Sequence, residues 1–455
     1  EQTPLIAYFA TCLLHQAGVP RKALQLLPGD GTVGAALTSS ARVDGVAFTG
    51  STQTAKNIRV KMAETLTPGA PFIAETGGLN AMIVDSTALP EQAVANIIES
   101  AFQSAGQRCS ALRCVYVQDD IAPEFIAMLI GAMRQLSLDD PWLLRSDLGP
   151  VIDPVAKARI SKHIAQAADQ NRVLWTQPVP LQGHYVAPTL IRVSGIEALE
   201  QEVFGPVLHL ATFASHQINA VIEAINNTGY GLTFGLQTRL SNRTRDIAQR
   251  IMAGNIYVNR NQIGAVVGSQ PFGGHGLSGT GPKAGGPFYL NRFHAVGQQN
   301  TSHSWDHIMS QTALTATMKT AATGLQSPDS FLPGPTGELN ARSTFAKPPI
   351  LCAGPGKKAA ETQAKAVTAL GGVAVKATGQ IQAEHLTDLT RLGAVIWWGD
   401  GPTARMFDLA LAARAGPIVA LITGQPDSAH VLFEQHVCID TTAAGGNAAL
   451  LRGDS

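Results

Sequence analysis

Three residues that lie far apart in the sequence have the chemical types needed for covalent chemistry on a carbonyl group. Cys109 supplies a thiol and follows Gly106 in the run Ser104-Ala-Gly-Gln-Arg-Cys109. Glu75 precedes Thr76-Gly77-Gly78, and Glu202 stands in Gln201-Glu-Val-Phe-Gly-Pro206. A thiolate is a nucleophile, and a carboxylate that reaches a water molecule is a general base. Glycine in each segment lets the backbone approach a ligand closely, so we expect the three segments to form one site.

The reactivity of Cys109 depends on how readily its thiol ionises. A free thiol has a pKa of about 8.5, and neighbouring positive charge lowers it. We expect Arg108 and Arg113 to have this effect, and the backbone N–H of Cys109 to stabilise the oxyanion that forms after attack. The alternatives are a small buried cysteine, since free cysteines are among the most buried residues, and a turn cap for Glu75.

Two further segments have the pattern of a nucleotide site. Val46-Ala-Phe-Thr-Gly-Ser51 reads as a strand that turns into a helix, an arrangement in which free N–H groups and the helix dipole favour phosphate. Thr49, Gly50 and Ser51 are the candidate ligands, although such turns are also common without a ligand. Glu202 and Phe204 could bind ribose hydroxyls and flank a nicotinamide ring; the alternative is a solvent-facing turn.

The elements that must position these residues alternate between strand and helix. This alternation predicts a doubly wound parallel sheet of the α/β class. Helices are expected over residues 5–19, 52–64 and 91–105, and a further helix is expected to follow a turn at 29–34 and to run through residue 39. Strands are expected over residues 24–27, 43–49, 71–74, 81–84, 113–118, 189–193, 207–213 and 255–258.

The C-terminal part of the chain changes character. Residues 296–345 are polar and rich in proline and glycine, and we interpret them as a linker. Residues 346–435 predict a small Rossmann-like α/β domain with strands at 350–353, 373–375, 394–398 and 418–422. Its Gly354-Pro-Gly356 lacks the spacing of a dinucleotide or P-loop motif, which favours a structural turn. Residues 436–455 are expected to form a strand-like tail.

Composition narrows the function classes. Of 455 residues, 33 are basic and 33 acidic, so the formal charge is zero, which argues against nucleic-acid binding as the main function. No apolar run reaches the roughly 18 residues of a membrane span. The five cysteines are scattered and predict neither disulfides nor a metal site, which fits a cytoplasmic protein.

In order and spacing, five motifs resemble those of the aldehyde dehydrogenase superfamily. The motifs are residues 46–54, 75–80, 106–110, 202–206 and Pro271-Phe-Gly-Gly274. The resemblance covers residues 1 to about 295 and implies the aldehyde dehydrogenase fold, with the remainder of an NAD-binding domain at 1–75 and a catalytic domain at 76–295. It implies Cys109 as nucleophile and Glu75 as base. It further implies Glu1, Thr49, Gly50, Ser51, Glu202 and Phe204 as cofactor ligands.

The run Gln270 to Pro287, with Leu332-Pro-Gly-Pro-Thr-Gly-Glu338 and Asp440 to Asn447, is similar to the C-terminal part of the proline utilization A family. That resemblance implies oxidation of L-glutamate γ-semialdehyde to L-glutamate with NAD, downstream of a proline dehydrogenase domain, in a homo-oligomer that channels its intermediate. The implied substrate contacts are Ser110, Gly285, Gly286 and Phe293.

The chain departs from the family pattern in lacking an upstream asparagine donor and the first half of the cofactor domain. We therefore expect a piece of a longer polypeptide that is inactive alone. One alternative is a non-catalytic scaffold or channelling part. Another is a cysteine hydrolase, but none of the twelve histidines lies in a matching motif.

Overall fold

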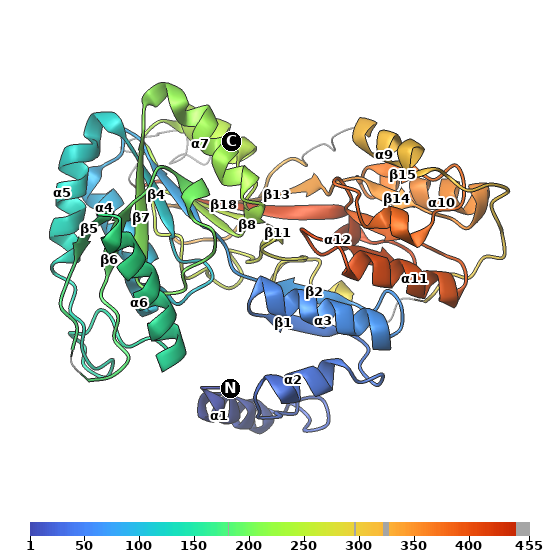
Figure 1. Ribbon diagram of the computed structural model, residues 1–455, viewed down its shortest axis with the longest axis horizontal. Coiled ribbons are helices and arrows are strands. Elements are labelled where there is room, and N and C mark those ends of the chain that lie inside the picture. The colour runs from blue at the N-terminus through green and yellow to red at the C-terminus, as the bar shows by residue number, and fades with distance from the viewer. Residues whose placement is uncertain (181, 295–296, 322–326, 443–455) are drawn as a thin grey trace.

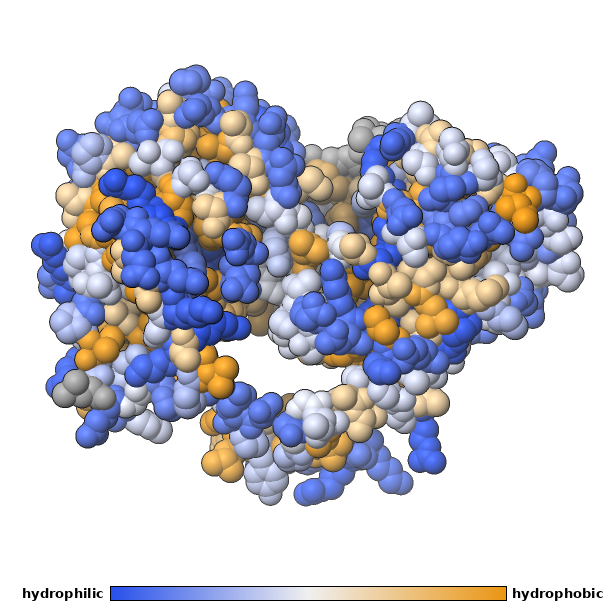
Figure 2. Space-filling view, in the orientation of Figure 1, coloured by the Kyte–Doolittle hydropathy of each residue, from blue (hydrophilic) through white to orange (hydrophobic). Residues whose placement is uncertain are grey.

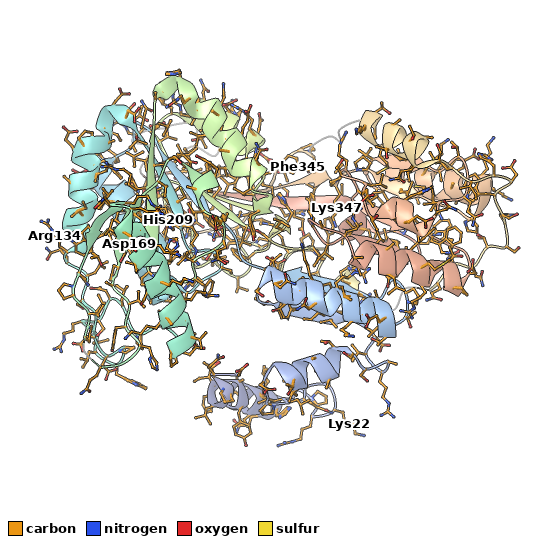
Figure 3. The ribbon with its side chains drawn as sticks, in the orientation of Figure 1. Lys22, Arg134, Asp169, His209, Phe345 and Lys347 are labelled. Atoms are coloured by element: carbon orange, nitrogen blue, oxygen red, sulfur yellow. The ribbon has the colours of Figure 1, made fainter. Side chains whose placement is uncertain are left out.

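The computed structural model describes residues 1–180, 182–294, 297–321 and 327–442. The chain forms two lobes, and the long strands β13 (Glu338–Ala346) and β18 (Leu432–Asp440) run between them (Figure 1). Phe345 of β13 and the adjacent Lys347 lie at this junction (Figure 3). The N-terminal residues form a separate arm below both lobes.

The larger lobe is built on a ten-stranded sheet with the order β12-β13-β18-β10-β9-β3-β4-β7-β6-β5. The strands from β18 to β6 pair in parallel, whereas β13 and β5 pair with their neighbours in antiparallel fashion. The remaining bounds are β3 (Ala81–Val84), β4 (Cys114–Gln118), β5 (Val173–Thr176), β6 (Thr189–Arg192), β7 (Val207–Phe213), β9 (Thr233–Gln237), β10 (Asn255–Val258) and β12 (Ser330–Leu332).

Both faces of this sheet are covered by helices. Ala81 and Ile83 of β3 enter the core under α6 (Pro154–Asp169), α7 (Ile218–Asn227) and α8 (Ser241–Arg250), while Met82 and Val84 enter the core under α4 (Pro90–Phe102) and α5 (Ala122–Met133). A strand buried on both faces needs an apolar run rather than alternation. Ile83→Ala would therefore cost about 2–5 kcal/mol.

The smaller lobe contains a four-stranded parallel sheet with the order β15-β14-β16-β17. Its strands are β14 (Ile350–Cys352), β15 (Ala374–Lys376), β16 (Ala394–Ile396) and β17 (Ala420–Ile422); its helices are α9 (Gln311–Thr320), α10 (Gly356–Ala369), α11 (Gly401–Ala412) and α12 (Ser428–Val431). The four strands predicted from sequence are thus confirmed. The Rossmann-like character of the domain stays a prediction.

A short parallel pair, β1 (Val46–Thr49) and β2 (Phe72–Glu75), lies between the lobes, with α3 (Thr52–Thr65) packed against α11. β8 (Tyr230–Gly231) and β11 (His275–Gly276) form another two-stranded sheet. The arm consists of α1 (Pro4–Gln16) and α2 (Gly31–Thr38), neither of which has a buried residue. Figure 2 shows hydrophobic side chains on this arm.

Three expectations from sequence are wrong or incomplete. Residues 24–27 form no strand, because no neighbouring strand pairs with them. The expected linker carries α9, β12 and β13, and the last two join the main sheet through β18. Strand β18 also crosses the expected boundary between residues 435 and 436, and residues 443–455 of the expected tail lie outside the described residues. Within the described chain, no helix is long and apolar enough to cross a membrane.

Candidate active site

Cys109 lies in a loop that joins α4 to β4. Gly106 in this loop has φ +67°, and a Cβ added there would lie 2.1 Å from the carbonyl oxygen of Gly205. Only glycine permits this approach. The loop of Cys109 is therefore pressed against the loop that carries Glu202.

Asn80 holds the Cys109 loop in place. Its Nδ2 donates to the carbonyl oxygens of Cys109 at 2.7 Å and Ala111 at 2.9 Å, and its Oδ1 accepts from the backbone N–H of Thr233 at 3.2 Å. Sequence reasoning placed Asn80 at the end of a motif without giving it a role. A polar residue directly before the buried strand β3 was the available signal.

Arg113 ties the two loops together. Its guanidinium donates to the carbonyl oxygens of Gly106 at 2.7 Å and Arg108 at 2.9 Å, and to Oε1 of Glu202 at 3.0 Å. His209 of β7, labelled in Figure 3, contacts the carbonyl oxygen of Arg113 through Nδ1 at 2.9 Å. Sequence reasoning missed this positioning role and treated Arg113 only as a charge beside the thiol.

The pKa of the Cys109 thiol is raised, whereas the flanking arginines had suggested a lowered one. Burial raises the pKa of the Cys109 thiol, and the charges of Glu202 and Glu75 raise it further, while the N–H groups of Ser110 and Cys109 lower it. The positive charge of Arg113 is engaged by Glu202, and Arg108 turns toward the hydroxyl of Ser104. Because the charges of Glu75 and Glu202 both act on the Cys109 thiol, the two predicted carboxylates lie near it.

Glu75 stands at the end of β2. Its Oε2 accepts from the backbone N–H of Gly274 at 3.0 Å, whereas its Oε1 is buried without a hydrogen-bond partner among the described residues. Burial raises the pKa of this carboxyl to about 8, opposed by the Gly274 N–H and by the charge of Lys283. A carboxyl with a pKa near neutrality and a spare oxygen suits general acid–base chemistry.

Glu202 occupies the space left by the missing side chain of Gly77. A Cβ added at Gly77 would lie 1.8 Å from Oε2 of Glu202, and the N–H of Gly78 donates to this carboxylate. Burial raises the pKa of Glu202, and Arg113 lowers it. The guanidinium carbon of Arg113 lies 5.2 Å from the centre of the Phe204 ring. Glu202 and Phe204 thus both lie beside the Arg113 guanidinium.

The predicted phosphate segment begins α3. Ser51 is the N-cap residue, with its Oγ accepting from the N–H of Thr54 at 3.1 Å. The N–H of Gly50 donates to the carbonyl oxygen of Glu75 at 3.1 Å, which links this turn to the predicted base. Thr49 pairs with Glu75 across β1 and β2. Glu1 lies exposed at the start of the arm, before α1.

Of the expected substrate contacts, the structure brings Ser110 but not Phe293 to Cys109. Ser110 is buried beside Cys109, and its carbonyl oxygen accepts from Thr233 Oγ1 at 3.1 Å. The N–H of Gly286 donates to the carbonyl oxygen of Lys283 at 3.0 Å, so it is not free to bind a substrate anion. Gly285, at φ +72°, forms the turn before it.

Phe293 is not brought to the Cys109 site. It is 60% exposed and packs against the Tyr289 ring at 5.4 Å between centroids. It lines a cavity of about 550 Å³ between β1, β2 and the end of β17, whose walls include neither Cys109 nor Glu75. Its role as a substrate contact stays a prediction. Among the described residues, no group of three or more His, Cys, Asp or Glu side chains could hold a metal ion.

The fold and the arrangement of Cys109, Glu75 and Glu202 agree with the proteins that this sequence resembles. Residues 1–298 match the aldehyde dehydrogenase family, and the chain belongs to that family. It is 41% identical to the bifunctional protein PutA of Salmonella typhimurium over 513 aligned positions, which cover 99% of the chain but 39% of that protein.

Solved structures give the same picture. A crystal structure of bifunctional proline utilization A matches with a TM-score of 0.63 at 52% identity, covering 64% of this chain and 30% of that one. The 1-pyrroline-5-carboxylate dehydrogenase from Thermus with bound NAD matches with a TM-score of 0.60 at 30% identity, covering 64% of this chain and 57% of that one. The chain thus spans about 39% of the length of the curated PutA relative.

Proposed function

We propose that this chain is the part of a longer polypeptide that oxidises L-glutamate γ-semialdehyde, formed from 1-pyrroline-5-carboxylate, to L-glutamate with NAD as oxidant. The observation that carries the proposal is that the partly buried Cys109, Glu75 and Glu202 lie on adjoining loops. Glu202 fills the space at Gly77, two residues after Glu75, and Arg113 binds both Glu202 and the loop of Cys109. The similarity to PutA and to a 1-pyrroline-5-carboxylate dehydrogenase with bound NAD supports the substrate and the cofactor.

In the proposed reaction, the thiolate of Cys109 attacks the aldehyde carbon, and the carbonyl oxygen becomes an oxyanion near the backbone N–H of Cys109. Loss of a hydride from the resulting thiohemiacetal leaves a thioester on Cys109. Glu75 then removes a proton from a water molecule that attacks the thioester carbon, which releases the carboxylate product and the thiol. Glu75 must be ionised for this last step.

The described residues fit part of an NAD site. The Ser51-capped N-terminus of the 14-residue helix α3 offers a positive dipole end for phosphate. The space at Gly77, where a Cβ would lie 1.8 Å from Glu202 Oε2, holds the carboxylate that is the proposed ribose ligand. We assign Thr49, Gly50, Ser51, Glu202, Phe204 and, in the completed cofactor domain, Glu1 to this site. When bound, NAD accepts the hydride.

The substrate's α-carboxylate needs an anchor away from the aldehyde. Ser110, beside the nucleophile, and the turn at Gly285 and Gly286 are the proposed contacts for this carboxylate, and Phe293 is proposed to pack against the aliphatic chain of the substrate. The carboxylate of Glu434 lies 2.9 Å from where a Cβ on Gly286 would stand, so a substrate anion there would also need a balancing cation. The buried Lys283 and the partly buried Arg342, which both interact with Glu434, supply positive charge nearby.

The wider setting is also part of the proposal. A proline dehydrogenase domain would precede these residues, the protein would be a cytoplasmic homo-oligomer, and the intermediate would pass between two sites. The isolated 455 residues would then have little activity. The second candidate, a non-catalytic scaffold, is disfavoured by the presence of nucleophile, base and Glu202 together.

The decisive experiment compares NADH formation by the N-terminally completed protein with 1-pyrroline-5-carboxylate and with propanal. A strong preference for the first supports both the oxidation and the carboxylate anchor. Equal or reversed preference would retain the dehydrogenase but remove the proposed substrate. No NADH with either substrate would favour the scaffold.

A further inference from the structure

Lys283 is a buried lysine that sequence reasoning left without an assigned contact. Only 3% of the residue is exposed, and its Nζ lies 2.5 Å from the carbonyl oxygen of Gly254, 2.9 Å from Oδ1 of Asn255 and 3.2 Å from the carbonyl oxygen of Pro271. An ammonium group has three donors, and here each has an acceptor. A neutral amine would leave one contact without a proton, so these contacts favour the charged form.

The same contacts connect Lys283 to the predicted base. Oδ1 of Asn255 also accepts from the N–H of Gly273 at 3.3 Å, and the next N–H, that of Gly274, is the one that binds Glu75. A Cβ on Gly273 would lie 2.8 Å from Oε1 of Glu75 and 3.2 Å from Cα of Lys283. Gly273 is therefore held between the two residues, and the ammonium fixes the segment that presents Gly274 to the carboxylate.

The other titratable groups around Lys283 lie on the strands β11, β13 and β18. Glu434 of β18 accepts from the N–H of Lys283 at 3.2 Å and pairs with Arg342 of β13. Burial lowers the pKa of His275 to about 4 and of His436 to about 3, so neither carries charge at neutral pH. Burial lowers the pKa of Lys283, while the carboxylates of Glu434 and Glu75 raise it. Lys283 is the cation whose charge favours ionisation of Glu75.

We propose that Lys283 is a positioning residue for the deacylation step: through Asn255 and the 271–274 segment it fixes the N–H that binds Glu75, and its charge favours the ionised, proton-accepting form of that carboxyl. The inference rests on the proposed role of Glu75 as general base. It assigns no contact between Lys283 and the substrate.

The test is the pH dependence of turnover in the N-terminally completed protein carrying Lys283→Met. Removing the cation raises the pKa of Glu75, so the acid limb of steady-state turnover should move up by about one pH unit, a loss of about ten-fold on the acid side. Activity should recover at higher pH. The rapid first turnover of NADH, which precedes deacylation, should keep its rate.

Lys347→Met is the matched control. Lys347 is a partly buried lysine that donates to the carbonyl oxygens of Ala429 at 2.8 Å and Thr280 at 3.5 Å. Among the described residues, no contact joins its side chain to Glu75 or to the 271–274 segment. It should lower the melting temperature without moving the acid limb. If Lys283→Met does not fold, Asn255→Ala removes one acceptor and the Gly273 contact, and should move the limb in the same direction by less.

An unmoved acid limb in every folded variant would overturn the inference. Glu75→Gln separates this failure from that of the proposed function. If Glu75→Gln abolishes deacylation while Lys283→Met and Asn255→Ala keep the normal pH profile, only the role of Lys283 is wrong. If Glu75→Gln retains full turnover, the proposed general base is wrong.

Discussion

Arg113 and Glu202 form a buried ion pair in which Nη2 of the arginine lies 3.0 Å from Oε1 of the carboxylate. Because the same guanidinium binds the carbonyl oxygens of Gly106 and Arg108, one side chain fixes both the loop of the nucleophile and the loop of the predicted ribose ligand. The two loops therefore form a single structural unit. Its disruption should affect both the nucleophile and the predicted ribose ligand.

Arg113→Met tests this unit. The substitution leaves the Glu202 carboxylate and the two carbonyl groups without their donor in a buried setting, where breaking an ion pair costs about 3–5 kcal/mol. Thermal unfolding should show a clear fall in melting temperature. Arg250→Met is the control, because the side chains of Arg250 and Asp246 are 36% and 62% exposed, and such pairs contribute about 0–1 kcal/mol. Equal melting temperatures for the two variants would contradict the structural role of Arg113.

The Cys109 thiol should react slowly with iodoacetamide at neutral pH. Burial and the charges of Glu202 and Glu75 raise its pKa, so the alkylation rate should keep rising above the pH at which an ordinary cysteine has ionised. Glu202→Gln removes a negative charge and should increase the rate at a given pH. Cys109→Ala measures the background from the other four cysteines, and in the completed protein it should abolish turnover while NAD affinity is kept. A midpoint below that of a free thiol would contradict the assignment.

Steady-state turnover should depend on ionisation of Glu75. Its folded-state pKa is raised to about 8, so the base form predominates only above that pH, and turnover limited by deacylation should fall as pH falls through about 8. Glu75→Gln in the completed protein should reduce turnover about 10²–10⁴-fold and keep the first burst of NADH. Glu64→Gln is the control, because it makes the same chemical change at an exposed carboxylate. Asp85→Asn would not serve, because the Asp85 carboxylate is buried in an ion pair. Loss of the burst itself would place Glu75 in an earlier step.

The sequence predicted the parts of the fold that depend on local pattern. The runs 81–84 and 255–258 form β3 and β10 with the expected bounds, because short apolar runs between polar residues suit strands buried on both faces. Residues 24–27 have a similar pattern, but no strand lies beside them, and a strand requires a partner. Strands β12 and β13 could not be predicted from their own residues because their pairing depends on β18, about ninety positions away in the register that joins Arg342 to His436.

The same distinction holds at the site. Cys109, Glu75 and Glu202 stand in glycine-containing motifs whose spacing is visible in the sequence. Asn80 and Arg113 act through carbonyl groups of other loops, and these contacts exist only after folding. A charged residue directly before a buried apolar strand, as at Arg113, is the signal that reasoning from sequence can add.

Arg59 of α3 and Asp408 of α11 form a second buried ion pair, with Nη2 and Oδ1 2.5 Å apart, that joins the β1–β2 unit to the smaller lobe. Arg59→Met leaves the Asp408 carboxylate buried without its cation and should cost about 3–5 kcal/mol, seen as a lower midpoint in urea unfolding. Lys61→Met on the same helix is the control: its pair with Glu64 is exposed by 56% and 43%, so its effect should stay within about 1 kcal/mol. The double variant Arg59→Met with Asp408→Leu should recover most of the loss, because an apolar pair of similar volume needs no counter-charge. If the double variant is as unstable as Arg59→Met alone, the contact between α3 and α11 depends on packing around Arg59 rather than on its charge.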